Sequence, residues 1–119
     1  MSEKQLINYV EFPAFDLDAT KAFFTEVFGW SFQDYGPEYT AFYDAGLDGG
    51  FYKSDKRSTT DAGGALIVFY SEDLEASLEK VKAAGGKIRL DIFSFPGGRR
   101  YQFLEPSGNE FGVWSDKGM

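Results

Sequence analysis

The sequence predicts an α+β fold in which two β-α-β-β-β modules form one domain. The chain has 119 residues, close to the usual size of a single domain, and 43% of them are hydrophobic, enough for one core. A strand–helix pattern occurs twice, and the same shift of 57 residues superimposes Asp16 on Asp73 and Gly29 on Gly86. Matching strand segments follow each helix, so we interpret the pattern as an internal duplication. The alternative is two unrelated strand–helix units that share ordinary capping residues.

The first module is expected at about residues 5–52. A strand at 6–12 leads to a helix whose apolar residues recur at helical spacing, with Asp16 as its N-cap and Gly29 at its end. Two short strands, a glycine-rich turn and a last strand are predicted at 30–32, 39–44, 46–50 and 51–52.

Residues 53–63 are polar, lack a periodic apolar pattern and are predicted to form a connecting loop. The second module follows at about residues 64–116. Its helix is expected to begin at the N-cap Asp73 and to end at Gly85 and Gly86. Four strands are predicted around that helix, at 66–70, 88–93, 100–105 and 110–114.

Composition excludes several classes of function. The 19 acidic and 12 basic residues give a net charge of −7, which repels nucleic acids and anionic membranes. There is no cysteine and no histidine, so thiolate chemistry and histidine acid–base catalysis are excluded for this chain. No export signal or membrane-spanning run is evident, and we expect a cytoplasmic protein.

Three motifs together resemble the vicinal oxygen chelate superfamily, which includes glyoxalases, bleomycin-resistance proteins and extradiol dioxygenases. They are the capped helix that closes with Val-Phe-Gly-Trp at 27–30, the Ala-Ala-Gly-Gly at 83–86, and the segment 103–111, Phe-Leu-Glu-Pro-Ser-Gly-Asn-Glu-Phe. The resemblance implies a curved eight-stranded sheet that forms a cup, with the helices on its outside. It also implies a homodimer, because members of the superfamily commonly complete their cups by pairing chains.

In enzymes of the superfamily, metal ligands lie on the first strand of each module and on the last strand. Counting from the motifs places Tyr9, Leu66 and Gly112 at these positions here, and the matching place in module 1 falls within 49–51. None of these residues is a plausible ligand of a divalent metal. We therefore predict that the protein has no metal site and needs no cofactor.

The strand period of two assigns alternate residues to the cup face. An aromatic and acidic cup suits a flat or cationic organic molecule. Glu11 and Glu110 are candidate general bases if an apolar cup raises their pKa values. Each aromatic residue could instead pack in a core or a dimer interface. The pair Arg99 and Arg100 could anchor a carboxylate or phosphate of a ligand, or it could be solvated or bridge to carboxylates of the protein. The candidate ligand-binding residues are Tyr9, Glu11, Leu66, Val68, Tyr70, Arg100, Glu110 and Trp114.

The predicted function is that of a metal-independent small-molecule-binding protein of the glyoxalase and bleomycin-resistance type. Two alternatives stay open. One is a lyase or isomerase that uses carboxylate and tyrosine acid–base chemistry, and the other is a structural or regulatory dimer.

Overall fold

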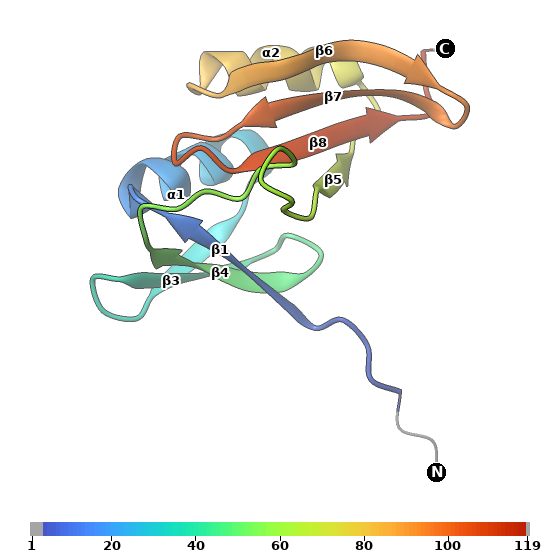
Figure 1. Ribbon diagram of the computed structural model, residues 1–119. Helices are drawn as coiled ribbons and strands as arrows, with labels where there is room; N and C mark the ends of the chain where they lie inside the picture. Colours follow the sequence, from blue (N-terminus) through green and yellow to red (C-terminus); the bar gives the residue numbers. More distant parts are fainter. Residues whose placement is uncertain (1–3, 119) are drawn as a thin grey trace.

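Both modules follow the predicted order in the computed structural model, which describes residues 4–118 (Figure 1). The α+β class and the two modules are confirmed. The first module consists of β1 (Tyr9–Ala14), α1 (Leu17–Phe28), β2 (Ser31–Asp34), β3 (Tyr39–Tyr43) and β4 (Asp48–Lys53). The second consists of β5 (Ile67–Tyr70), α2 (Leu74–Ala83), β6 (Lys87–Phe95), β7 (Gly98–Leu104) and β8 (Glu110–Ser115).

The helices begin at the predicted caps. Oδ1 of Asp16 accepts a hydrogen bond from the amide of Ala19, and Oδ1 of Asp73 accepts one from the amide of Ala76, both at 3.0 Å. Gly29 ends α1 in the left-handed conformation, with φ of 73°, which glycine adopts without steric cost. Neither helix, within residues 4–118, is long and apolar enough to cross a membrane.

The predicted glycine-rich turn at 46–50 is too long, because β4 already begins at Asp48. Gly49 and Gly50 therefore lie inside a strand. A Cβ atom at Gly49 would lie 2.4 Å from the ring of Phe42, so the missing side chain is what lets that ring pack against the strand.

The eight strands form two four-stranded sheets, in the orders β1-β4-β3-β2 and β5-β8-β7-β6. In each sheet the first and last strands of the module pair in parallel, and the other pairs are antiparallel. The identical order agrees with the duplication. The curved eight-stranded sheet that the resemblance implies is thus divided into two halves, one in each module.

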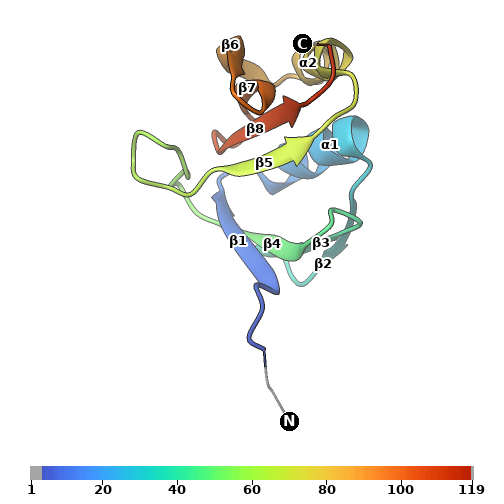
Figure 2. The same cartoon turned by 90° about the vertical axis from the view of Figure 1, so that its right-hand side faces the viewer.

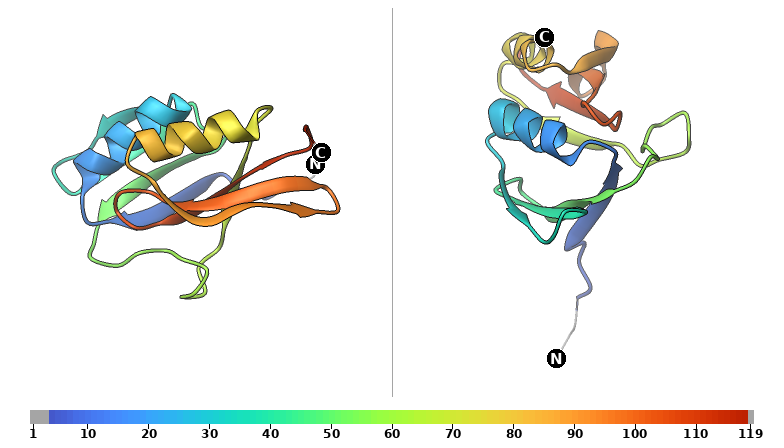
Figure 3. Two further views of the ribbon diagram at one scale, coloured as in Figure 1. Left: turned by 90° about the horizontal axis from the view of Figure 1, so that it is seen from above. Right: turned by 90° about the vertical axis from the view of Figure 1, so that its left-hand side faces the viewer.

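The two sheets share one hydrophobic core through the faces that contact the helices. Phe24 of α1 stacks on Phe51 of β4, at 5.7 Å between ring centroids, and meets Phe111 of β8 edge-on at 5.2 Å. Phe12 of β1 also contacts Phe111, at 5.0 Å. Figure 2 shows α1 between the sheets. The opposite face of each sheet therefore points away from the shared core and not toward the other sheet, as the views in Figure 3 also show.

A buried polar cluster joins the β7–β8 turn to the first module. The carboxylate of Glu105 accepts hydrogen bonds from the hydroxyl of Thr20 at 2.7 Å and the amide nitrogen of Asn109 at 2.7 Å. The same side-chain amide donates to the carbonyl of Pro13 at 2.7 Å. Burial raises the pKa of Glu105, although these donors oppose the rise. The cluster fixes the end of β1 against the second module.

Candidate functional site

Two surfaces carry the predicted site residues. We define the module-1 face and the module-2 face as the sheet faces that point away from the shared core. The alternation that the sequence predicts is present, because Phe12, Phe111 and Val113 belong to the core and Ile67 packs against it. The module-1 face carries Tyr9, Glu11, Tyr39, Tyr43 and Tyr52, and the module-2 face carries Leu66, Val68, Tyr70, Arg100, Gln102, Glu110 and Trp114.

On the module-1 face, Tyr39 connects the two predicted residues of β1. Its hydroxyl donates to Oε2 of Glu11 at 2.9 Å and lies 2.6 Å from the hydroxyl of Tyr9. The ring of Tyr39 reaches β1 by crossing β4 above Gly50, where a Cβ atom would lie 2.2 Å from the tyrosine oxygen. Sequence reasoning missed Tyr39. The strand period of two, which puts Tyr39 on the same face as Tyr43, was the available signal. The contact between Tyr39 and Glu11, however, depends on the order of the strands in the sheet.

This tyrosine is held in its protonated form. Burial raises the pKa of Tyr39, and the hydrogen bonds with Tyr9 and Glu11 raise it further. The phenol is therefore a stable hydrogen-bond donor, and the carboxylate of Glu11 is its acceptor. Together the three side chains form a short hydrogen-bonded path on the module-1 face that could donate or accept a proton.

The positions at which the resemblance implies metal ligands carry residues that are poor donors to a divalent cation. A Cβ atom at Gly112 would lie 3.5 Å from Cδ2 of Leu66, so these two positions adjoin but supply only a methyl group and hydrogen. The phenol of Tyr9 is bonded to Tyr39. Within residues 4–118, no group of three or more histidine, cysteine, aspartate or glutamate residues could hold a metal ion. The donor set thus does not fit a divalent cation.

Glu110 is an anchor for the connecting loop. Its Oε1 accepts hydrogen bonds from the amide and the hydroxyl of Thr60, both at 2.8 Å, and its Oε2 accepts one from Nε2 of Gln102 at 2.6 Å. Burial alone would raise the pKa of Glu110, but these donors outweigh it and the pKa is lowered. The condition under which Glu110 would act as a general base, a raised pKa, is therefore not met. With only 2% of its surface exposed, Glu110 is also poorly placed to reach a substrate proton.

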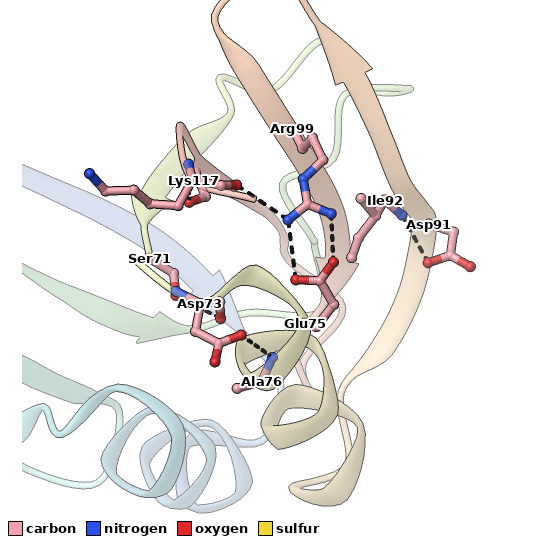
Figure 4. Close-up of polar contacts among 9 residues, drawn as sticks. Ser71, Asp73, Glu75, Ala76, Asp91, Ile92, Arg99 and Lys117 are labelled. Carbon is pink, nitrogen blue, oxygen red and sulfur yellow. Dashed lines mark hydrogen bonds and ion pairs between the residues drawn. The ribbon is translucent and has the colours of Figure 1, made fainter. Parts of the chain in front are cut away.

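The adjacent arginines of β7 lie on opposite faces of the sheet. Arg99 points to α2, where its Nη1 and Nη2 atoms bind both carboxylate oxygens of Glu75, as Figure 4 shows. Its Nη2 also donates to the carbonyl of Lys117 at 3.3 Å. Arg100 points to the module-2 face and forms no ion pair with another described residue. The bridge to carboxylates that we considered for the arginine pair is made by Arg99 alone.

Arg100 borders an open pocket of about 340 Å³ on the module-2 face. Its guanidinium carbon lies 5.3 Å from the ring centroid of Phe93 and 5.9 Å from that of Phe95. Tyr70 packs edge-on against Trp114, at 5.1 Å between centroids. The pocket is lined by Val68, Phe95, Gly97, Arg100 and Trp114.

The structure thus brings Val68, Tyr70, Arg100 and Trp114 together, whereas Tyr9 and Glu11 lie on the other face. Leu66 and Glu110 belong to the module-2 face but do not line its pocket. Sequence reasoning missed the two phenylalanines of β6, because register shifts in its pairing with β7 disturb the strand alternation. A second cleft, of about 400 Å³, lies between the modules and has mostly aromatic and aliphatic walls.

Comparison with known proteins agrees with this architecture. A glyoxalase-related enzyme from Fulvimarina pelagi superimposes with a TM-score of 0.78 and 17% identity, over 94% of this chain and 88% of that chain. Lactoylglutathione lyase from Agrobacterium tumefaciens gives 0.70 and 22%, over 96% of each chain. A variant of the fosfomycin resistance protein FosX from Listeria monocytogenes, complexed with Mn(II) and a dihydroxypropylphosphonic acid, gives 0.75 and 21%, over 95% and 90%. These similarities concern the fold.

A search of curated protein sequences finds no match to the chain. A family model matches residues 6–113, which is most of its length. The family that this match identifies is also the one that the three motifs resemble. The chain belongs to the Glyoxalase/Bleomycin resistance protein/Dioxygenase superfamily.

Proposed function

We propose that the protein binds a small organic molecule on its module-2 face without a metal ion. The observation that carries this proposal is the pocket between Val68, Trp114, Phe95 and Arg100. Apolar and aromatic walls with one polar group are typical of small-molecule sites, in which the walls supply affinity and the polar group fixes orientation. Tyr70, which packs against Trp114, extends the aromatic surface beside the pocket.

Metal independence is part of the proposal and rests on side-chain chemistry. Three of the four family positions hold Tyr9, Leu66 and Gly112, and the fourth falls within residues 49–51. Tyr9 already bonds to Tyr39. The nearby carboxylates of Glu11 and Glu110 are bound by protein donors as well. Protein purified without added metal should contain no stoichiometric metal by elemental analysis, and adding Mn²⁺ or Zn²⁺ should leave ligand affinity unchanged.

Pairing of two chains is also proposed. The module-1 and module-2 faces point away from each other within one chain, and both carry exposed aromatic side chains, including Tyr9 and Tyr70 at 45% and 46% exposure. A second copy would place one face opposite the other and complete a cup. Sedimentation velocity should then give the mass of a dimer, and Tyr70→Glu should shift it toward the monomer while Glu38→Lys, an exposed change away from both faces, should not.

A metabolite and antibiotic panel tests the binding proposal. A ligand of the pocket should raise the melting temperature of the protein, and the rise should grow with the logarithm of the ligand concentration once this exceeds the dissociation constant. Trp114→Ala should abolish the shift, whereas Phe15→Ala, which removes an exposed aromatic ring between β1 and α1, should retain it. If no compound of the panel acts, or if both variants respond like the original protein, the binding proposal is wrong and a structural dimer is the better account.

A lyase or isomerase is a second candidate, favoured by the hydrogen-bonded path through Tyr9, Tyr39 and Glu11. A protonated phenol beside a carboxylate provides an acid and a base for moving one proton. Product analysis on each hit of the panel tests this function. Turnover that is lost in both Glu11→Gln and Tyr39→Phe, with ligand binding retained, would support it, whereas unchanged turnover in both would remove the path from the mechanism.

A further inference from the structure

Arg100 stands in a row of aromatic residues that crosses the whole module-2 sheet. Across the strands, Tyr70 pairs with Trp114, Trp114 with Arg100, and Arg100 with Phe93. Residues directly opposite each other in a sheet lie on the same face and are in contact distance. The guanidinium therefore has an aromatic neighbour on each side, one of which it approaches at 5.3 Å.

This guanidinium lacks an anionic partner within residues 4–118. The other arginines near carboxylates are paired, since Arg89 binds Asp61 at 3.0 Å and Arg99 binds Glu75. Arg100 is half-buried but makes no hydrogen bond through its side chain to the described residues, and its buried Nε atom has no partner. Asp116, just after β8, is bonded instead to the hydroxyl of Tyr70.

A half-buried cation without a counter-charge is unusual in a chain with 19 acidic residues. Contact with aromatic rings offsets part of its desolvation, but it leaves the N–H groups without acceptors. Guanidinium N–H groups form a planar fork that matches the two oxygens of a carboxylate or a phosphonate. Val68 and Trp114 line the same pocket and would contact the apolar body to which such a group is attached.

We infer that the ligand of the module-2 pocket is a small organic anion whose carboxylate or phosphonate binds Arg100 and whose apolar body lies against Trp114. This inference rests on the proposed binding function and specifies the charge of its ligand. It reverses the expectation from the net charge of −7, which would gather a cation. The acids that support that expectation are occupied, Glu11 by Tyr39 and Glu110 by Thr60 and Gln102.

The experiment uses the two tryptophan indole N–H signals of the ¹⁵N-labelled protein. Trp114 lies in the pocket and Trp30 lies in the core at 5% exposure, so the second signal is an internal control. Four probes share one ring and differ in charge: benzoate, phenylphosphonate, the neutral benzamide and the cationic benzylamine. Each is titrated into the full chain in a buffer free of phosphate and sulfate, and then into Arg100→Gln and Arg99→Gln.

We expect benzoate or phenylphosphonate to move the Trp114 signal and leave Trp30 in place, and the stronger of the two identifies the anionic group. Benzamide and benzylamine should bind at least about tenfold more weakly than the stronger anion. Arg100→Gln should weaken the anion about tenfold, whereas Arg99→Gln, the adjacent residue on the opposite face, should not. A matching sedimentation run should give the same mass for both variants and the original protein.

Three results would overturn the inference. The first is that benzylamine or benzamide binds as tightly as the anions. The binding function would then stand, but the ligand would not need a negative charge. The second is that none of the four probes moves the Trp114 signal although the panel yields a ligand. In that case the binding function stands and the anionic ligand is wrong. The third is that Arg100→Gln dissociates a dimer, which would show that the guanidinium binds a carboxylate of a second copy.

Discussion

Tyr39 and Arg100 occupy equivalent places in the two sheets but have opposite surroundings. Tyr39 pairs with Tyr52, which pairs with Pro13, and Arg100 pairs with Trp114, which pairs with Tyr70. The shift of 57 residues that relates the modules superimposes Pro13 on Tyr70. Tyr39 makes hydrogen bonds within its own sheet, whereas the guanidinium of Arg100 makes none with the described residues.

The difference shows how a duplicated scaffold acquires two kinds of surface. Backbone order and register are shared, so they place a side chain at the same point above each sheet. The chemistry of the side chain then decides whether its polar groups bond within the protein or stay available to a ligand. At this position the module-1 side chain, Tyr39, is hydrogen-bonded within its own sheet, and the module-2 side chain, Arg100, has unused hydrogen-bonding capacity.

The largest effect on stability should come from Gly50, which lies below the ring of Tyr39 and whose equivalent in the second sheet is Gly112. At Gly50 a Cβ atom would lie 2.2 Å from the hydroxyl of Tyr39 and 2.9 Å from the carbonyl of Thr40, whereas at Gly112 its closest contacts are 3.5 Å. Gly50→Ala should therefore lower the free energy of unfolding by about 3 kcal/mol through overpacking. Gly112→Ala should change it by less than about 1 kcal/mol. Urea unfolding measures both, and equal effects would contradict the contrast between the faces.

A smaller loss is expected when the anchor of the connecting loop is changed. Glu110→Gln removes the charge that accepts three hydrogen bonds and should cost about 2 kcal/mol at pH 7. Because the folded-state pKa of Glu110 is lowered, its contribution is present above the ordinary glutamate pKa and is lost as the pH falls through the folded value. The variant should lose less stability than the original protein on acidification.

Chemical unfolding at several pH values below 5 or so tests this, since the ordinary glutamate pKa is about 4.3. Glu38→Gln is the control, because its side chain is exposed and makes no hydrogen bond with another described residue. A parallel acid profile for Glu110→Gln and the original protein would show that the carboxylate does not hold the loop.

The smallest of the three effects should come from the module-1 hydroxyl. Tyr39→Phe removes hydrogen bonds to Tyr9 and Glu11 and should cost about 1 kcal/mol at neutral pH. Since the folded-state pKa of Tyr39 is raised, stability is present below the ordinary tyrosine pKa of about 10 and falls as the pH rises above it. Tyr101, whose pKa burial raises to about 12, contributes to the same fall.

Tyr39→Phe should therefore reduce the alkaline loss of stability without abolishing it. Tyr52→Phe is the matched control on the same face, because its hydroxyl makes no hydrogen bond with another described residue. Guanidinium chloride unfolding at neutral and alkaline pH compares the two variants. The path through Tyr9, Tyr39 and Glu11 would be refuted if both variants showed the same alkaline profile.

Local sequence signals were sufficient for the helix starts and the strand faces, whereas the expected arrangement of the sheet came from the family resemblance. Asp16 and Asp73 predicted both helix starts because capping depends on neighbouring residues alone. The strand period of two placed Glu11 and Trp114 on outward faces for the same reason.

The candidate site depends on contacts between strands that are distant in the sequence, and these were not predictable. The bond between Tyr39 and Glu11 requires β4 to lie between β1 and β3 and to carry a glycine at the crossing point. Arg99 and Arg100 are consecutive, so only the sheet decides which one meets α2. The division of the cup into halves follows from the contact between Phe12 and Phe111, which joins the inner faces of two sheets.

That contact also limits how the molecule can respond to a ligand. Tightly packed interiors resist deformation, and the aromatic rings around Phe24 belong to both sheets at once. A hinge motion of one module relative to the other would have to separate these packed rings. We therefore expect the angle between the two sheets to stay the same when a ligand binds. Adjustment to a ligand is thereby left to the edge strand β6, whose pairing with β7 contains register shifts, and to rotations of single side chains.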